Sequence, residues 1–559
     1  MTAQNVEIKN NFFNLLFSNG DFRKLKVNDV EFIQRIYFAV RDEEWLNEPY
    51  TITNFRSKTN QNVIIYSYTM SFGNDIKLVV DITFAINNNH ITIEAKGKAL
   101  KDFKKNRIGF CMHLPVSLRS ADCNITHDDD KKSEAVFPRF VSPHQPFKNI
   151  RSIEWNSNNL GIKISFEGDI FEMEDQRNWT DASYKIYSTP LDKPFPVLVN
   201  KEEEFYQKIS VEILESKSIA TIPAHIHLSK NIEETVASPM FGIVEDRNNN
   251  IDGIISENKK TLPFSHYRVD FFLSNKSWQK DSLQRVVRAA ALNLPVYAVV
   301  VFGNNYQLQA TEFIAYIQSL KNFAVHSVCL LSSQNFVLPD EAFRVLIPLM
   351  RNAFSTALLG GGTDANFAQL NRHRPNASLL DFVCYSIQPQ EHASDELSVI
   401  ENIQGQADTV ATAKSFSKEK DIHIAALSFF RRFNANIDFV SNDKTVACEH
   451  TGSSLEASWF IGSLHELITA GAACINCYYP LRENLSLIKI LIFMAQNPPE
   501  SFYTCGSYLP EKYSLLSWKS GSYRHSFFAN LTNALVKTAH PFGAINLQPY
   551  EISHIKTLL

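Results

Sequence analysis

The sequence lacks the signals that would place the protein in a membrane, on nucleic acid or in a secretory route. Its first residues, Met-Thr-Ala-Gln-Asn-Val-Glu, do not show the basic-then-apolar order of a signal peptide. No window approaches the roughly 20 consecutive apolar residues of a membrane span. The net charge is only −4, and long like-charge runs are missing apart from Asp128–Lys132, which has the composition of an exposed loop. We therefore expect a cytoplasmic protein that binds neither nucleic acid nor membrane.

Several common catalytic motifs are also missing. There is no Gly-x-Ser-x-Gly elbow, which gives a serine-triad mechanism little support, and no His-Glu-x-x-His pair to hold a metal. We expect no metal and no cofactor, although separated histidines could still converge on a metal-bound water. The triplet Gly360-Gly361-Gly362 lacks the patterns of nucleotide-binding loops. We expect instead that these small residues let the backbone approach a compact ligand.

Cysteine chemistry is not expected either. The eight cysteines lie mostly in apolar, strand-like runs, which predicts reduced core residues and poor nucleophiles. Cys474-Ile475-Asn476-Cys477 has the C-x-x-C spacing, but the second ligand pair of a zinc site is missing.

A chain of 559 residues exceeds what one hydrophobic core normally supports, so two or three domains are expected. Residues 1–205 contain short runs of alternating apolar and polar residues, separated by clusters of Asn, Gly and Asp, as antiparallel hairpins require. These runs predict an N-terminal β-sandwich domain, with strands at 32–40, 62–70, 77–84, 90–96 and 107–114.

From residue 215 to 495 the pattern changes to short apolar strands that alternate with helix-length periodic stretches. This alternation predicts a (β/α)8 TIM barrel. The eight expected strands are 240–244, 267–273, 296–302, 325–331, 355–359, 381–387, 422–428 and 473–478. Residues 500–559 again alternate and predict a small C-terminal β module, which we expect to pack on the barrel or to complete the N-terminal β layer.

The segment Phe171–Lys185 is the densest concentration of functional groups in the chain. It places carboxylates, cations and amides around Trp179 and Tyr184, directly after an alternating run that predicts a strand. A solvated, salt-bridged hairpin would have this composition, but aromatic residues set among charges also suit a polyol or sugar-acid site. We expect a loop that carries functional side chains of the site.

A second set of candidates follows from the barrel prediction, because TIM-barrel active sites lie at the carboxyl ends of the strands. After the predicted sixth strand, Glu391 and His392 are two neighbouring groups that could take a proton from water. Neighbours on an extended segment point to opposite sides, so both would face a substrate only if the chain turns there. Asp395 and Glu396 are expected to cap the next helix, for which Ser394 is a good N-cap residue.

Two stretches of sequence resemble a known family. They are Phe171–Ser183 with the following Thr189-Pro190-Leu191, and Gly360–Phe367 continuing to Leu370–Pro375. Both resemble the D-apionate lactonases of bacterial branched-sugar catabolism, and with the order of elements the likeness covers nearly the whole chain. The resemblance implies a TIM-barrel middle domain between β-rich flanks, and hydrolysis of D-apionolactone to D-apionate.

The preferred hypothesis is a sugar-lactone hydrolase in which a carboxylate or histidine activates water and arginine and amide groups polarise the carbonyl. Its small-molecule partner is the lactone, and the oligomeric state is left open. The candidate catalytic residues are Glu391, His392, Glu174 and Asp175. The candidate substrate-binding residues are Arg177, Asn178, Asp181, Lys185, Glu245, Arg268, Asp364, Asn366, Asn371, Arg372, Gln390 and Arg431. Those between Glu174 and Lys185 are expected to reach the barrel mouth from the β domain.

Two alternatives stay open. A glycoside hydrolase of the retaining barrel type would place carboxylates after strands four and seven. The sequence offers Leu331-Ser332-Ser333-Gln334 and Ser428-Phe429-Phe430-Arg431 there, neither of which supplies one. A non-catalytic carbohydrate-binding protein is the other alternative.

Overall fold

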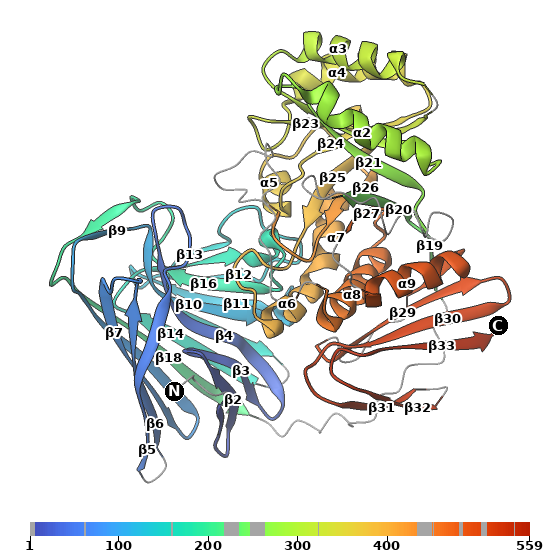
Figure 1. Cartoon of the computed structure of the whole chain (residues 1–559). Coiled ribbons are helices and arrows are strands. Elements are labelled where there is room, and N and C mark those ends of the chain that lie inside the picture. Colours follow the sequence, from blue (N-terminus) through green and yellow to red (C-terminus); the bar gives the residue numbers. More distant parts are fainter. Residues whose placement is uncertain are drawn as a thin grey trace. The chain divides into compact units, whose positions relative to one another are not determined.

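The computed structural model describes residues 6–60, 63–157, 160–216, 234–245, 263–321, 323–432, 450, 452–479, 485–504, 511–540 and 543–559. The chain forms two compact units (Figure 1). Unit 1 comprises Met1–Gln176 and Ser183–Ile222, and unit 2 comprises Arg177–Ala182 and Pro223–Leu559. The short segment Arg177–Ala182 therefore belongs with unit 2, although its chain neighbours on both sides belong to unit 1. None of the described helices is long and apolar enough to cross a membrane.

Unit 1 is built on one large antiparallel sheet. Its strands follow the order β1 (Val6–Lys9), β2 (Phe13–Ser18), β3 (Asp21–Val27), β4 (Val30–Arg41), β10 (Arg107–Pro115), β16 (Ser183–Ser188), β15 (Phe171–Asp175), β13 (Phe147–Ser157), β14 (Leu160–Glu167), β18 (Glu204–Ser216), β8 (His90–Ala99), β7 (Leu78–Asn87), β6 (Val63–Phe72) and β5 (Tyr50–Asn60). Strand β11 (Asp122–His127) pairs with β13 and with β12 (Lys132–Val136), and β9 (Phe103–Lys105) pairs with β17 (Val197–Val199). The short 3-10 helix η1 (Val116–Leu118) belongs to unit 1, and η2 (Gln176–Trp179) begins with the last residue of unit 1 before Arg177–Ala182 of unit 2.

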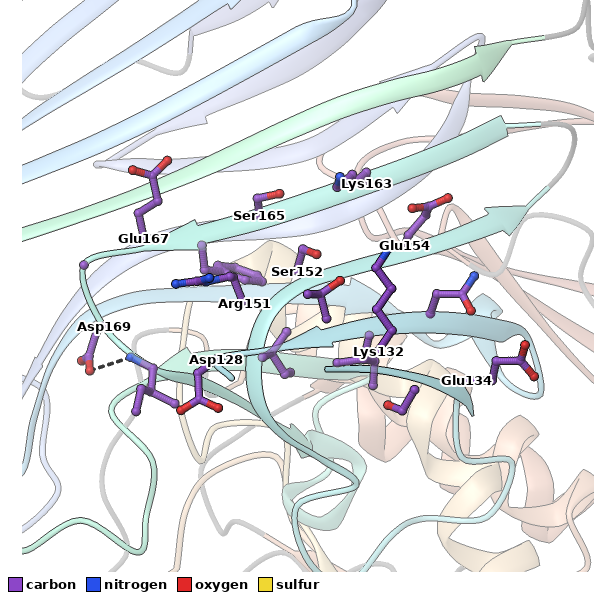
Figure 2. A pocket seen from close by; sticks show the side chains of 18 residues that line it. Asp128, Lys132, Glu134, Arg151, Ser152, Glu154, Lys163, Ser165, Glu167 and Asp169 are labelled. Atoms are coloured by element: carbon purple, nitrogen blue, oxygen red, sulfur yellow. Dashed lines mark hydrogen bonds between the residues drawn. The ribbon is translucent and has the colours of Figure 1, made fainter. Parts of the chain in front are cut away.

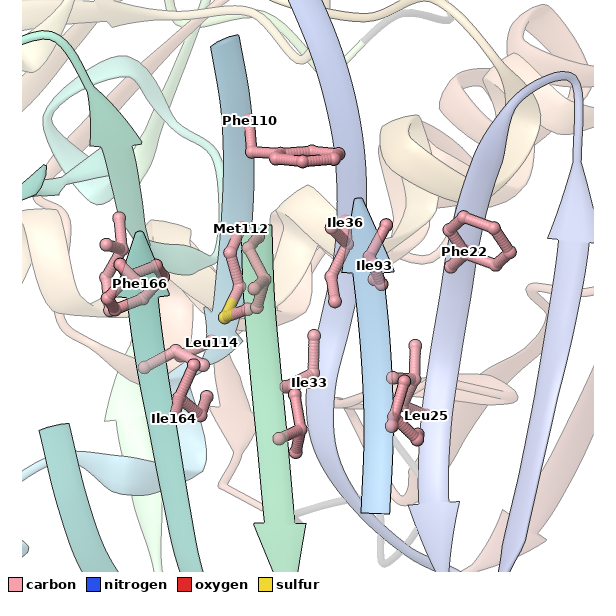
Figure 3. Packing of buried hydrophobic residues seen from close by; sticks show 14 of the residues in the cluster. Phe22, Leu25, Ile33, Ile36, Ile93, Phe110, Met112, Leu114, Ile164 and Phe166 are labelled. Carbon is pink, nitrogen blue, oxygen red and sulfur yellow. The ribbon is translucent and has the colours of Figure 1, made fainter. Parts of the chain in front are cut away.

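The core of unit 1 lies between two halves of this sheet. Alternate side chains of its strands point inward, which is the period-two pattern seen in the sequence. Figure 3 shows residues of β3, β4 and β10 packed with residues of β8 and β14. Phe22 of β3 stacks on Phe84 of β7 with ring centroids 4.1 Å apart. The all-β prediction is confirmed, and the two face-to-face layers are parts of one continuous sheet.

Unit 2 contains the predicted parallel barrel. Its closed strand order is β20 (Met240–Glu245), β21 (His266–Phe272), β22 (Val296–Phe302), β23 (Val325–Ser332), β24 (Leu358–Gly362), β25 (Phe382–Ile387), β26 (Asp421–Leu427) and β27 (Cys474–Tyr479). The helical segments are α2 (Trp278–Ala291), α3 (Tyr306–Ser319), α4 (Asp340–Ala353), α5 (Phe367–Arg372), η3 (Ala377–Leu379), α6 (Glu396–Glu401), η4 (Asn402–Gly405), α7 (Gln406–Phe416), α8 (Ser454–Thr469) and α9 (Leu485–Gln496). The TIM-barrel prediction is confirmed.

The glycine triplet lies inside strand β24, whereas the predicted strand ended at residue 359 and the triplet was expected to approach a compact ligand. A Cβ atom on Gly360 would stand 2.4 Å from the ring of Phe382, and one on Gly361 would stand 2.5 Å from the ring of Phe343. The expectation of close approach to a ligand is therefore corrected at these two positions. Two neighbouring aromatic rings occupy the space that side chains would need.

A five-stranded antiparallel sheet completes unit 2. Its order is β19 (Thr235–Ala237), β28 (Ser501–Tyr503), β29 (Tyr513–Ser520), β30 (Tyr523–Asn530) and β33 (Ile552–Leu558), and a separate hairpin joins β31 (Val536–His540) to β32 (Gly543–Leu547). Phe493 of α9 packs against the rings of Phe527 and His554, and Ser458 of α8 donates a hydrogen bond to the Tyr550 carbonyl at 2.9 Å. The sheet thus packs on helices of the barrel. Its edge strand β19 precedes the barrel in the chain, which the sequence did not predict.

The described cysteines fit the prediction of reduced core residues. Cys111, Cys123, Cys329, Cys384, Cys474 and Cys477 are all free and buried. Burial raises the pKa of the Cys477 thiol to about 12, which keeps it protonated and unreactive at neutral pH. Cys448 and Cys505 lie outside the described residues.

Candidate active site

The loop after strand β25 carries Glu391, whose half-buried carboxylate lies at the carboxyl end of the barrel. Oε2 of Glu391 accepts hydrogen bonds from Asn366 Nδ2 at 3.0 Å and from Gln388 Nε2 at 2.7 Å. The other oxygen, Oε1, has no hydrogen-bond partner among the residues that the structure describes. Two side-chain amides thus fix the carboxylate through one oxygen, and the second oxygen stays available to accept a proton or a substrate hydroxyl.

The next residue, His392, forms a hydrogen-bonded pair with Asp181. Nδ1 of the ring is bonded to Oδ2 of Asp181, and Oδ1 of the same carboxylate accepts from Asn402 Nδ2 at 2.9 Å. A carboxylate at Nδ1 places the ring proton there and leaves Nε2 as the basic nitrogen. Nε2 has no partner in the described part of the chain. This arrangement is that of a general base oriented by an aspartate.

Asp181 reaches this position because its short segment is fixed to the barrel at several points. The fully buried Arg177 guanidinium forms an ion pair of 2.9 Å with Asp408 of α7. Asn178 Oδ1 accepts from Asn371 Nδ2 at 3.0 Å, and Thr180 Oγ1 donates to the Gln388 carbonyl at 2.7 Å. We call Arg177–Ala182 the arm. Its contacts connect it to α5, to the loop that carries His392 and to α7.

Aromatic and cationic groups of the arm and α5 lie around this pair. The Trp179 ring meets the His392 ring edge to face with centroids 6.1 Å apart. The Arg372 guanidinium carbon lies 5.3 Å from the Trp179 centroid. A half-buried cation and an indole next to a basic nitrogen form a surface that suits a small polar ligand.

Below the mouth, a buried carboxylate that follows β24 is bonded to β21, to β25 and to the segment after β26. Asp364 accepts from Arg268 at 2.9 and 2.6 Å, from Arg432 at 3.0 and 2.9 Å, and from the Ser386 hydroxyl at 2.8 Å. Burial alone would raise the pKa of Asp364, but the two guanidiniums outweigh burial and hold that pKa well below its usual range. We call Asp364, Arg268, Arg432 and Asp270 the charge network.

Arg268 has no N–H group left for a substrate. Its Nε and Nη2 donate to Asp270 at 2.7 and 3.4 Å, and Nη1 donates to the Ala425 carbonyl at 2.6 Å as well as to Asp364. With the second Asp364 bond, every donor of this guanidinium is committed. The geometry therefore gives Arg268 and Asp364 a structural task, and their predicted contact with substrate stays a prediction.

The structure brings many of the predicted site residues together at the mouth of the barrel. Glu391, His392, Asp181, Asn366 and Arg372 share the contacts described above, and Asn371 and Asn178 bond to each other. Gln390 donates to the Phe429 carbonyl at 2.6 Å, and Arg431 is half-buried just beyond strand β26. The roles of these residues remain predictions.

Other predicted residues belong to unit 1 or lie outside the described residues. Glu174, Asp175 and Lys185 belong to unit 1, where Asp175 accepts from the Ser142 amide at 2.9 Å and Glu174 accepts from Gln176 at 3.0 Å. The Lys185 ammonium lies 5.2 Å from the Tyr187 centroid. The side chain of Glu245 is outside the described residues.

One correction and three omissions concern the surroundings of the site. The N-cap of α6 is Asp395 rather than Ser394, because the Asp395 side chain accepts from the Ser398 amide at 3.1 Å. Sequence reasoning also missed Asn402, Asp408 and Arg432. The sequence signal for Asp408 was the lack of a continuous apolar face in α7. Polar residues stand at positions where an amphipathic helix would carry apolar ones, and the structure shows that they are buried.

A metal centre finds no support among the described residues, which contain no group of three or more His, Cys, Asp or Glu side chains placed to hold an ion. The sequence does contain one His-x-His pair, His225-Ile226-His227, which the expectation of no metal overlooked. That pair lies outside the described residues, so the expectation stays untested.

The all-β unit and the closed parallel barrel, with polar side chains gathered at the carboxyl ends of its strands, have the architecture of a TIM-barrel enzyme. Comparison with known families is consistent with this class. Residues 2–216 match the model of the D-apionate lactonase N-terminal domain, and residues 255–484 match the model of the D-apionate lactonase TIM barrel domain. The chain belongs to the D-apionate lactonase family and is a lactone-hydrolysing enzyme.

Individual relatives are distant. The D-apionate lactonase of Brucella anthropi is 26% identical over 427 residues, which cover 72% of this chain and 69% of the relative. Among solved structures, a β-arabinopyranosidase aligns over 99% of this chain and 97% of its own with a TM-score of 0.34 and 8% identity. A GH30 endoxylanase from Clostridium papyrosolvens aligns over 58% of this chain and 98% of its own with a TM-score of 0.39 and 12% identity.

Proposed function

We propose that this enzyme opens D-apionolactone to D-apionate, and that His392 is the base that activates the attacking water. The observation that carries the proposal is the Asp181–His392 pair, whose Nε2 is directed away from its carboxylate partner and has no partner among the described residues. Membership of the family and the name of the Brucella anthropi relative support the choice of substrate. The lactone is the small-molecule partner of the site.

In the proposed reaction, His392 Nε2 takes a proton as the water oxygen bonds to the lactone carbonyl carbon. Negative charge then grows on the carbonyl oxygen, and a half-buried cation such as Arg372 or Arg431 would stabilise it. When the bond between the carbonyl carbon and the ring oxygen breaks, the imidazolium returns its proton to the departing alkoxide. The product acid ionises at neutral pH, so each turnover releases one proton to solution.

Asp181 would support the base in two ways. Its carboxylate fixes the ring orientation through Nδ1, and its negative charge stabilises the imidazolium that forms during the reaction. Asn402 keeps the carboxylate in place, because its side-chain amide donates both to Asp181 at 2.9 Å and to the Pro389 carbonyl at 2.8 Å. The arm and the loop after β25 are thus joined at the point where the base is held.

Glu391 is the competing candidate for the base. Its carboxylate turns toward Asn366, whereas the neighbouring His392 turns toward the arm, so the two side chains make separate sets of contacts. A carboxylate with one open oxygen also suits the binding of a substrate hydroxyl. We assign Glu391 to substrate positioning, and this assignment separates it from His392 in experiment.

The test follows proton release in a pH-stat when the purified enzyme meets freshly prepared D-apionolactone, with and without a chelator. His392→Asn keeps an amide donor for Asp181 but removes the base, and we expect a loss of about 10²–10⁴-fold in kcat. Glu391→Gln should mainly raise KM. His373→Asn is the matched control, because His373 is an exposed histidine at the end of α5.

Two outcomes would contradict the proposal. Wild-type release no faster than the spontaneous rate would remove the lactonase function on this substrate. A near-normal kcat for His392→Asn together with its loss in Glu391→Gln would make Glu391 the base.

A further inference from the structure

Unit 1 contains a polar hollow on the outer surface of its sheet, which we call the basin. It has a volume of about 1090 Å³ and lies over strands β11, β12, β13 and β14 (Figure 2). Its central side chains are Asn124, Thr126, Ser152, Glu154, Lys163 and Ser165. All of them belong to unit 1 and none belongs to the proposed catalytic site.

The register of the strands explains why the sheet is hollow here. Thr126, Ser152 and Ser165 are direct neighbours across β11, β13 and β14, and they form a row of short hydroxyl side chains. Two residues further along, Glu154 and Lys163 form a parallel row of longer side chains. Figure 2 shows the two serines and the two charged residues on adjacent strands. The short hydroxyl side chains form the floor of the basin, and the longer charged side chains form one of its walls.

Three polar groups of the basin, the Ser152 hydroxyl and the charged ends of Glu154 and Lys163, lack partners among the described residues. Ser152 is only 8% exposed, yet its hydroxyl has no hydrogen-bond partner among the described residues. Glu154 and Lys163 stand directly opposite each other and form no ion pair with any described residue. The similar pair Glu167 and Lys208, also directly opposite, closes at 3.1 Å. Unpaired charges side by side, next to a hydroxyl without a partner among the described residues, indicate groups left available for a ligand.

The chemistry of these groups selects the class of ligand. Glu154 can only accept hydrogen bonds, Lys163 can only donate, and the hydroxyls of the floor do both. The lining residues include five carboxylates (Asp128, Glu134, Glu154, Glu167, Asp169) against three cations (Lys132, Arg151, Lys163), a balance of −2 that disfavours an anion. Sugar hydroxyls carry no charge and are both donors and acceptors.

We infer that the basin binds a neutral sugar, independently of the lactone-hydrolysing site in unit 2. Clefts of about 300–1,000 Å³ hold ligands of drug size, so the basin has room for a short neutral glycan. Phe166, the aromatic residue among those that line it, is buried, so no ring is exposed for stacking. Binding should therefore be weak, with Kd on the order of 1 mM, and should depend on the polar groups.

The test measures binding of xylotriose and cellotriose to the full-length protein by saturation-transfer NMR and calorimetry. Galacturonic acid serves as the anionic probe and should bind at least about tenfold more weakly. The double variant Glu154→Gln/Lys163→Met should weaken binding of the neutral probes by at least about tenfold while lactone hydrolysis stays unchanged. Glu94→Gln/Lys96→Met is the control, since this exposed pair on β8 lies outside the basin.

A second variant guards against misfolding of the first. Ser165→Asn fills the floor without changing charge, and it should reduce binding in the same way. The inference is overturned if neither neutral probe binds at millimolar concentration, if the acidic sugar binds as well as the neutral ones, or if both basin variants bind like the control.

Discussion

The two ends of the barrel contain different kinds of buried polar group, which are charged residues at the carboxyl end and neutral histidines at the amino end. At the carboxyl end, the charge network keeps Asp364 ionised between Arg268 and Arg432. At the amino end, the interior contains His266 and His423, near the starts of strands β21 and β26, and both rings are buried. Charge is therefore concentrated where TIM barrels carry chemistry, and the opposite end uses polar groups that stay neutral.

The packing at the amino end shows why these histidines are neutral. The His266 ring lies against His326 and Tyr297, with centroids 5.4 and 5.2 Å away, and its Nε2 donates to Asn476 Oδ1 at 2.8 Å. Burial lowers the pKa of His266 to about 4, and burial likewise holds the pKa of His423 well below its usual range. No carboxylate is bonded to either ring in the described part of the chain, so protonation would create an uncompensated buried charge.

The largest expected effect comes from breaking the charge network. Asp364→Asn would remove one of the negative charges that compensate two buried guanidiniums. Removal of one partner of such a network lowers the free energy of unfolding by about 3–5 kcal/mol. We expect a large drop in the thermal midpoint and in the free energy of unfolding measured with urea. Asp381→Asn is the control, because its ion pair with Arg351 is partly exposed and should matter much less. Equal losses for the two variants would show that the network contributes no more than a surface pair.

The second expected effect concerns acid and the amino end. An unfolded histidine has a pKa of 6.5, whereas folded His266 has one of about 4, so between these values the unfolded chain binds more protons. Stability should therefore fall as pH drops from about 6.5 to 4, by up to about 3 kcal/mol for His266, at about 1.4 kcal/mol per unit. Asp364 needs more acid, because its pKa is far below its usual range. On acidification, protonation of the buried histidines at the amino end should therefore lower the stability before the charge network is protonated.

A melting-temperature series from neutral pH to pH 4 measures this order. His266→Gln keeps a donor for Asn476 and should flatten the pH dependence, whereas His373→Gln, an exposed histidine, should leave it unchanged. A wild-type protein that becomes more stable over this range would contradict the neutral state of the buried rings.

The sequence predicted those features of the two barrel ends that depend on patterns among neighbouring residues. Strand ends and their alternation with helices are local, so the barrel and the loop with Glu391 and His392 could be located. The partner of His392 could not, because Asp181 is 211 positions away in the chain. Glycines 360–362 suggested the end of a strand, since glycine usually marks a break there. The Phe343 and Phe382 rings that explain them became visible only in the packing.

The smallest expected effect tests what else holds the carboxyl end in place. Asp395 caps α6 through bonds from the Ser398 amide at 3.1 Å and the Ser398 hydroxyl at 2.8 Å, and Asn402 follows directly after this helix. Asp395→Ala should cost about 1 kcal/mol of unfolding free energy, while Ser394→Ala, at the position first expected to be the cap, should change it by less than about 0.5 kcal/mol. Because Asn402 holds Asp181, a loosened α6 should also lower the rate of lactone hydrolysis slightly. If Asp395→Ala lost stability but kept the full rate, the Asp181–His392 pair would depend on the arm rather than on α6. If Ser394→Ala were the costlier change, the helix would begin one residue earlier, and the cap would be the one that the sequence predicted.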